Sequence, residues 1–267
     1  MLWQNSAMLR ELAGHQLVPP EKNFRWRGGE ITRLEGFTDA VFAFAVTLLV
    51  VSLEVPHTYA ELITAMKGFV AFSICFAILI QVWYYHYIYS RRYGLQTTYT
   101  IILNAILLFV VLFYVYPLKF LFTLVVGEFT GGRTVPAEQL NRMITSHDAP
   151  TLMVIYSAGY TAVFVIFTLL YHHAYSKRQE LLLNEYETLR TRHAVMFHIG
   201  FALIGVLVII SALLLPERYA GMAGLLFCLN AVIGFVGGST LGKRERHALE
   251  RMQTTGKAAT ADHLSTH

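Results

Sequence analysis

The residues with the clearest potential for chemistry are an arginine and an aspartate at the start of an apolar segment. Arg33 and Asp39 are followed by a stretch that contains no charged residue until Glu54. An ionisable side chain this close to hydrocarbon is costly, and it persists where it has a partner or a function. Arg33 and Asp39 are six positions apart in the sequence, which puts their side chains about 120° apart around a helix. They are therefore not a natural intrahelical pair. We therefore expect Asp39 to meet His86 or Arg91 of the next apolar segment.

A helical wheel places four residues of the first segment on one stripe. With Ala40 as the origin and about 100° per residue, Phe44 lies at about 40° and Thr47 at about −20°. Arg33 continues the stripe at one end, whereas Asp39 lies at about −100° and is turned toward a neighbouring helix. The complete stripe is Ala40, Phe44, Thr47 and Val51.

The stripe admits two interpretations. It could be a packing face, because small and hydroxyl residues mark many helix contacts and Thr47 can bond to the carbonyl four residues before it. It could also line a pore, because channels use apolar constrictions that exclude water and rings of oxygens that replace hydration. One chain with so few polar residues cannot line a water path alone, so a pore would require several copies around an axis.

The composition predicts an all-α membrane protein. The chain is 55% hydrophobic and 14% charged, with a mean hydropathy of +0.49. Soluble domains carry about 25% charged residues, so this chain lacks the polar surface that they need. About 20 apolar residues cross a bilayer as a helix. Six runs of about that length or longer are present, at residues 37–53, 62–89, 99–126, 151–171, 194–215 and 219–241.

The distribution of Lys and Arg predicts that both termini are cytoplasmic. With the N-terminus inside, most of the 21 basic residues fall on inner segments, as the positive-inside rule requires. The predicted organisation is a cytoplasmic segment at 1–32, a six-helix transmembrane domain at 33–242 and a basic, partly disordered cytoplasmic tail at 243–267. We expect a multi-pass protein of the plasma membrane. This topology accounts for the pI near 9.0, so a nucleic-acid partner need not be invoked.

The sequence carries no enzyme signature. It has no His-Glu-x-x-His, no Gly-x-Ser-x-Gly and no phosphate-binding glycine loop. His172 and His173 are adjacent, so on a helix they point about 100° apart and cannot share a metal as residues i and i+4 do. Cys75 and Cys228 are isolated thiols in apolar runs. We expect neither an enzyme nor a metal site, and no cofactor.

The start of the first apolar segment resembles a family signature. Arg33, Phe37, Thr38 and Asp39 resemble the Arg-x-x-x-Phe-Ser-Asp motif on the first helix of the transmembrane protein 175 type of potassium channel, with Thr38 in place of serine. The substitution keeps a hydroxyl group at this position.

Two further patterns extend the resemblance over about the first 117 residues. Trp83-x-x-His86 on the second segment resembles the Trp and His pattern that follows the signature in this family. Asn104, followed by two leucines and Pro117, resembles its Asn-leucine-proline pattern on the third helix. The later segments are similar to the family only in number and hydropathy.

The resemblance implies a six-helix subunit, four of which assemble around an axis lined by the first helix. It implies a potassium-permeable cation channel with K+ in the pore, and proton conduction is reported for some relatives. By resemblance, the gate and selectivity layers are Phe44, Thr47 and Val51. Phe44 stands where leucine or isoleucine is usual, which would tighten the constriction. The signature network would consist of Arg33, Phe37, Asp39, Trp83, His86 and Asn104.

Other functions remain open at this point. The resemblance also allows a proton-permeable channel, and a non-conducting membrane scaffold fits the composition equally well. A secondary transporter is disfavoured, because it would need a charged site at the membrane midplane and broken helices. The position of Asp39 and the stripe on the first helix favour a channel over a scaffold.

Overall fold

The computed structural model describes residues 24–51, 57–135, 137–145, 147–240 and 242, and their regular structure is entirely helical. The predicted all-α class is therefore confirmed for these residues. The elements are α2 (Arg33–Val51), α3 (Tyr59–Lys67), α4 (Phe69–Tyr93), α5 (Thr98–Phe129), α6 (Ala137–Met143), α7 (Ala149–Ser176), α8 (Glu185–Leu214), α9 (Glu217–Ala220) and the 3₁₀ helix η1 (Gly221–Cys228). Residues 229–240 are also helical.

Five helical segments are long and apolar enough to cross a membrane, judged by length and composition. They are Glu61–Tyr93, Thr98–Phe129, Ala149–Ser176, Glu185–Leu214 and Glu217–Thr240. These segments correspond to the second to sixth predicted spans. The first, α2, has 19 residues and carries charged side chains in its first two turns. Six spans per subunit, both termini in the cytoplasm and a tetramer remain predictions.

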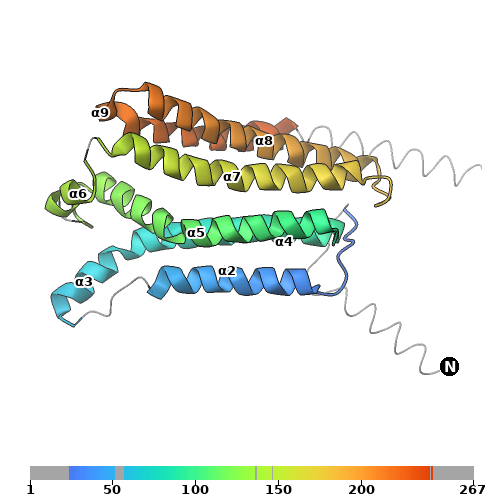
Figure 1. Cartoon of the computed structure of the whole chain (residues 1–267), viewed down its shortest axis with the longest axis horizontal. Coiled ribbons are helices and arrows are strands. Elements are labelled where there is room, and N and C mark those ends of the chain that lie inside the picture. Colours follow the sequence, from blue (N-terminus) through green and yellow to red (C-terminus); the bar gives the residue numbers. More distant parts are fainter. Residues whose placement is uncertain (1–23, 52–56, 136, 146, 241, 243–267) are drawn as a thin grey trace, which may run out of the picture.

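Two of the predicted spans contain a break in the α-helix. The run at 62–89 is divided at Gly68 into α3 and α4, which meet at an angle in Figure 1. The run at 219–241 passes through the 3₁₀ helix η1, which has a tighter turn than an α-helix. The predicted inner connection after the fourth span is short, because α7 continues to Ser176 and α8 begins at Glu185. The segments predicted at 1–23 and 243–267 lie outside the described residues.

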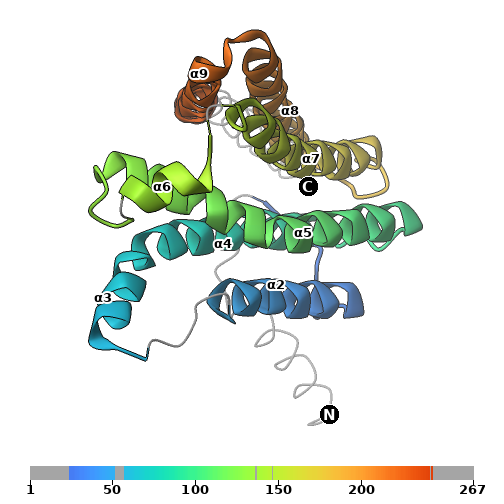
Figure 2. The ribbon, with the colours of Figure 1, turned by 60° about the vertical axis from the view of Figure 1, so that its left-hand side comes forward.

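The helices form three layers (Figure 1). α2 lies on one side, α4 and α5 lie in the middle, and α7 and α8 lie on the other side, and Figure 2 gives the same order from another direction. α5 contacts α2, α4 and α7, whereas α2 contacts α4 and α5 alone among the described elements. The start of α2, the end of α4 and the turn between α7 and α8 lie at one end of the bundle. We call it the inner end, because the sequence predicts it to be cytoplasmic.

Side-chain caps fix where the helices of the inner end start and stop. Thr32 and Glu35 cap α2 reciprocally, with the backbone N–H of each bonded to the side-chain oxygen of the other at 2.9 and 3.1 Å. Asn184 and Glu187 form the same capping box at the start of α8. α4 ends at Tyr93, and its C-cap residue Gly94 has a left-handed φ of 58°, which favours glycine.

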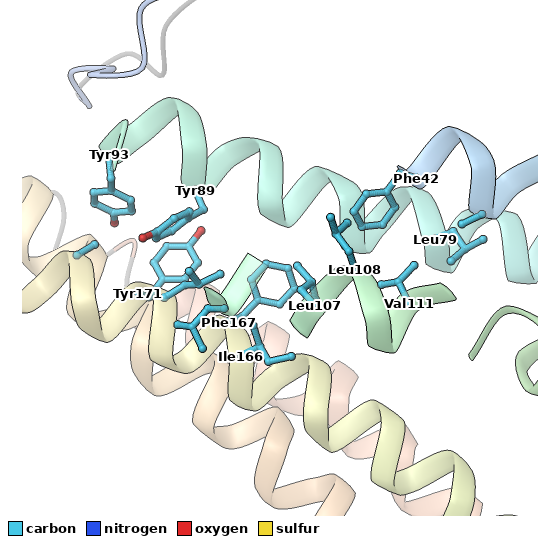
Figure 3. Close-up of a cluster of buried hydrophobic side chains, with 14 of the residues drawn as sticks. Phe42, Leu79, Tyr89, Tyr93, Leu107, Leu108, Val111, Ile166, Phe167 and Tyr171 are labelled. Carbon is cyan, nitrogen blue, oxygen red and sulfur yellow. The ribbon is translucent and has the colours of Figure 1, made fainter. Parts of the chain in front are cut away.

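One apolar core joins the three layers (Figure 3). Phe42 of α2 packs beside Leu108 of α5, and Phe167 of α7 packs from the opposite layer. Three buried tyrosines extend this core to the inner end, where their rings meet in edge-to-face or tilted pairs. These tyrosines are Tyr89, Tyr93 and Tyr171.

The packing of α5 on α7 depends on a glycine. A Cβ added to Gly159 would collide with the ring of Tyr114, whose hydroxyl donates a hydrogen bond to the Ile155 carbonyl at 2.9 Å. Because this bond holds the ring in place, the ring cannot easily give way to a larger residue. By contrast, a Cβ added to Gly234 would have no atom within 4 Å.

We predict that Gly159→Ala lowers the free energy of unfolding by about 1–3 kcal/mol, because it forces overpacking between α5 and α7. Thermal unfolding in detergent micelles measures the change. Gly234→Ala is the matched control, since it adds the same methyl group to open space and should leave the melting temperature unchanged or slightly higher. Equal melting temperatures for the two variants would contradict this account of the α5–α7 contact.

Candidate ion pathway and polar network

The pore-helix candidate α2 has one buried face. Thr38, Phe42, Ala45 and Leu49 recur at spacings of four, three and four residues, and each is at most 4% exposed. This periodicity forms one side of an α-helix, and that side packs on α4 and α5. The burial pattern therefore fixes which side of α2 turns away from its own chain.

The predicted stripe lies on the opposite, uncovered side of α2. Ala40, Phe44 and Thr47 are all exposed, and Phe44 is 55% exposed. Within the described part of the chain, no helix packs against this side. The side chain of Val51 lies outside the described residues. The stripe is therefore free to face lipid, another copy of the chain or a water-filled axis.

The Thr47 hydroxyl has a defined orientation. Its oxygen donates a hydrogen bond to the Ala43 carbonyl four residues earlier, at 2.9 Å. This is the local bond expected for threonine in an apolar helix. Because the proton is used by Ala43, the lone pairs of the oxygen remain available on the exposed side. A hydroxyl held in this way is suited to accept a hydrogen bond or to contact a cation.

A first polar contact links α2 to α4. The indole N–H of Trp83 donates to the Asp39 carboxylate at 2.8 Å. The sequence predicts His86 or Arg91 for this role, and the structure places Trp83 there instead. His86 is buried and lies in the electrostatic field of Asp39. Arg91 instead donates to the Gly29 carbonyl at 2.8 Å and stacks over Tyr87.

A second polar contact links α2 to α5. The amide nitrogen of Asn104 donates to the Thr38 hydroxyl at 2.7 Å, and that hydroxyl donates to the Leu34 carbonyl at 2.8 Å. Thr38 and Asn104 are almost fully buried, and His86 lies beside the Asn104 side chain. A serine could make the same two hydrogen bonds. The threonine at the position of the signature serine therefore preserves the chemistry of the contact.

The structure brings together four of the six predicted network residues. Asp39, Trp83, His86 and Asn104 meet where α2, α4 and α5 pack at their inner halves. Arg33 is exposed, and Phe37 is 60% exposed on the uncovered side of α2. These two side chains are presented outward from the subunit.

A buried ion pair between Arg27 and Glu187 was not predicted from the sequence; Nη2 of Arg27 lies 2.6 Å from Oε2 of Glu187. The sequence signal for Glu187 was its place three residues after Asn184, the spacing of a capping box. Nothing in the local sequence pointed to Arg27 as its partner. Among the described residues, no group of three or more His, Cys, Asp or Glu side chains could hold a metal ion.

Comparisons with known proteins find relatives that match most of the chain. Residues 33–114 match the family described as the endosomal/lysosomal potassium channel TMEM175. A protein of Marivirga tractuosa named "Potassium channel" is 39% identical over 233 residues, which cover 85% of this chain and 94% of that protein. The crystal structure of a variant of the potassium channel MtTMEM175, in complex with a Nanobody–MBP fusion protein, is 38% identical with a TM-score of 0.75. The match covers 85% of this chain and 100% of that one.

We predict that Thr38→Val lowers the free energy of unfolding by about 1–3 kcal/mol, because the buried Asn104 amide loses its hydrogen-bond acceptor. Thr38→Ser is the matched control, since it keeps the hydroxyl and should retain most of the wild-type stability. Thermal unfolding of the three proteins in the same detergent measures the difference. A Thr38→Val protein as stable as the serine variant would show that this hydrogen bond does not stabilise the packing of α2.

Proposed function

Because this chain belongs to the TMEM175 family of potassium channels, we propose that it is a potassium-permeable cation channel whose pathway is lined by α2 from four copies. Its relatives are channels and not enzymes, in keeping with the absence of catalytic signatures from the sequence. The monovalent cation is the permeant species in this proposal, and no cofactor is required. The protein would be a multi-pass protein of the plasma membrane.

The observation that carries the proposal is the uncovered stripe on α2, opposite its buried face. Four copies arranged with this stripe toward a common axis would cover it and would enclose a path that no single subunit can enclose. The helix that lines the axis would also be held to its own subunit by two side-chain hydrogen bonds, one of them buried. Those contacts would fix its rotation relative to the axis.

Phe44 and Thr47 would form two successive layers of the path with different functions. Four Phe44 rings would form an apolar constriction, and a sufficiently narrow apolar neck excludes water and so blocks ions. One turn further from the inner end, four Thr47 oxygens would face the axis with their lone pairs free, because each proton is bonded to Ala43. These oxygens would contact a partly dehydrated cation. Ala40 is small and would widen the path on the inner side, and Val51 would continue the apolar lining.

The basic residues support a cytoplasmic location for the inner end. Arg91 and Arg92 end α4, and Lys177 and Arg178 occupy the turn between α7 and α8. Cytoplasmic loops carry an excess of such residues. In this orientation, Phe44 would lie closer to the cytoplasm than Thr47.

We predict that Thr47→Val lowers the ratio of potassium to sodium flux by at least about fivefold, since it removes one oxygen from each of four copies and the loss of one such contact commonly costs about 1 kcal/mol. Phe44→Ala should raise total flux by widening and wetting the constriction. Flux from liposomes of purified protein measures both effects under potassium, sodium and proton gradients. Thermal unfolding of the same samples separates altered conduction from altered folding.

A matched control is Val50→Thr, which makes the reverse exchange of similar shape on α2. Val50 is 46% exposed but lies about 60° from Thr47 around the helix. Its flux ratio should equal that of the wild type. Flux unchanged by both Thr47→Val and Phe44→Ala would end the case for a pathway along this stripe. Flux of protons alone would favour the proton channel, and no flux of any ion would favour the scaffold.

We also predict that the purified protein is a homotetramer, because the stripe requires several copies to enclose a path. Native mass spectrometry from mild detergent, and light scattering of the protein in lipid nanodiscs, measure the number of copies. A single monomeric species under both conditions would rule out a shared axis lined by α2.

A further inference from the structure

The chain enters α2 through a short lead-in segment, residues 24–32, that is held from two sides. Figure 1 shows this segment in blue at the inner end, running from the region of the α7–α8 turn to the start of α2. Its first described residue, Phe24, is 2% exposed and packs edge-on against Tyr93 of α4. The Arg92 guanidinium lies over the Phe24 ring, 5.0 Å from its centroid. The lead-in segment is therefore part of the folded core.

The lead-in segment is bound on one side by an ion pair with α8. The guanidinium of Arg27 makes a two-pronged contact with the Glu187 carboxylate, at 2.6 and 3.2 Å. Glu187 is 1% exposed and the Arg27 side chain 13% exposed. The same carboxylate accepts the backbone N–H of Arg25 at 2.7 Å and that of Asn184 at 3.1 Å. Glu187 therefore binds the lead-in segment and caps α8 at once.

Two further Arg27 donors bind the turn between α7 and α8, and a third, on Nη1, donates to the Arg25 carbonyl at 2.8 Å. The Nε atom donates to the Leu181 carbonyl at 2.7 Å, and Nη2 donates to the Leu182 carbonyl at 3.2 Å. Leu182 has a φ of 49°, a left-handed conformation that is unfavourable for leucine. Such a conformation persists where surrounding contacts enforce it. Arg27 supplies such contacts through its hydrogen bonds to the Leu181 and Leu182 carbonyls.

On its other side, the lead-in segment is bound to the end of α4. The backbone N–H groups of Arg27 and Gly28 both donate to the Arg91 carbonyl, at 3.1 and 3.0 Å. A Cβ added to Gly28 would come within 2.7 Å of the Ser90 carbonyl, so this close approach requires glycine. The Arg91 guanidinium returns a hydrogen bond to the Gly29 carbonyl. Three residues later, Thr32 begins the cap of α2.

We infer that the Arg27–Glu187 pair positions the pore helix, by tying the start of α2 to the α7–α8 turn. This inference rests on the proposed function, and it names Arg27 and Glu187 as positioning residues for the conduction path. α2 contacts α4 and α5 but neither α7 nor α8 among the described elements. The pair, with the lead-in segment, therefore provides the direct connection between α8 and the start of α2. Movement of the α7–α8 turn is transmitted by it to the helix that carries Phe44 and Thr47.

The chemistry of the pair fits positioning better than simple stabilisation. A buried ion pair loses much of its attraction to the cost of removing both charges from water, so it is weak evidence for a gain in stability. What a two-pronged arginine–carboxylate contact adds is a defined geometry. A lysine at position 27 would keep the charge but would lose the fork and the bonds to both carbonyls of the turn.

The test compares two variants of the pair with a matched ion pair in the same turn. Glu187→Gln keeps the shape of the side chain and removes its charge. Arg27→Lys keeps the charge and removes the planar guanidinium that makes the two-pronged contact. Lys177 and Glu180 pair at 2.7 Å in the α7–α8 turn and are more exposed, so Lys177→Gln is the control. We expect both variants to lower the potassium-to-sodium flux ratio about fivefold or more, at the lower end of the range for coupled sites. The double variant should lower it no further, because both substitutions break one interaction.

A spectroscopic measurement distinguishes positioning from stabilisation. A spin label at Val50→Cys, in a Cys228→Ser background, reports distances between α2 helices of neighbouring copies by pulsed electron paramagnetic resonance. The distance distribution should broaden in both variants while the copy number stays that of Lys177→Gln. The melting temperature should fall more in Glu187→Gln, which leaves the Arg27 charge without its partner, than in Arg27→Lys, which keeps both charges. Broadening that also appears in Arg27→Lys is therefore not explained by lost stability.

Three outcomes decide the inference. A broadened distribution with a lowered flux ratio supports it. Flux ratios and distances equal to those of the Lys177→Gln control would overturn it, and so would changes that appear only together with loss of the assembly. A wild-type protein that assembles but conducts no potassium would refute the proposed function instead, and the distance distributions would still test whether the pair positions α2.

Discussion

The constraint on which the structure depends is that α2 can bury only one side within its own chain. The buried side meets α4 and α5 through Thr38, Phe42, Ala45 and Leu49. Everything on the opposite side, including Phe44 and Thr47, is left uncovered by the described residues. In lipid, leaving an apolar side of a helix uncovered costs little free energy. A row of aromatic and hydroxyl side chains on that side can line a path when several copies share an axis. The fold of one subunit thus prepares a surface that only an assembly would complete.

Two hydrogen bonds at the edges of the buried side set the rotation of α2. Asp39 and Thr38 lie about 100° apart on the helix, and they are held by Trp83 of α4 and Asn104 of α5. A rotation by one residue would break both bonds and leave the buried Asn104 amide unsatisfied, which is costly in a low-dielectric interior. The apolar contacts of Phe42 and Leu49 alone would tolerate small rotations. The polar contacts therefore define the angle at which the stripe faces outward.

Much of this could be predicted from the sequence, because hydrophobic periodicity is a local property. The apolar runs located the helices, and the wheel placed Phe44 and Thr47 on one side and Asp39 off it. The wheel gave Asp39 a direction but not a partner, since the relative height of α2 and α4 decides that Trp83 reaches it. The break at Gly68 and the 3₁₀ turn of η1 escaped prediction, because an apolar run has the same composition in either helix type. Arg27 and Glu187 are 160 residues apart, and only the fold shows that they meet.

Under the proposed function, the contacts of α7 and α8 give the second half of the chain a role in an ion path that it does not line. α7 and α8 lie on the far side of α5 from α2, yet they reach the start of α2 through the lead-in segment. A binding site that distinguishes similar ions must hold its oxygens to within about 0.5 Å, which a helix anchored at one end by its cap alone would not guarantee. Anchoring both the buried side of α2 and the segment that enters it restricts rotation, tilt and sliding together. If Thr47 selects the ion, its selectivity therefore depends on residues far from the axis that hold α2 in place.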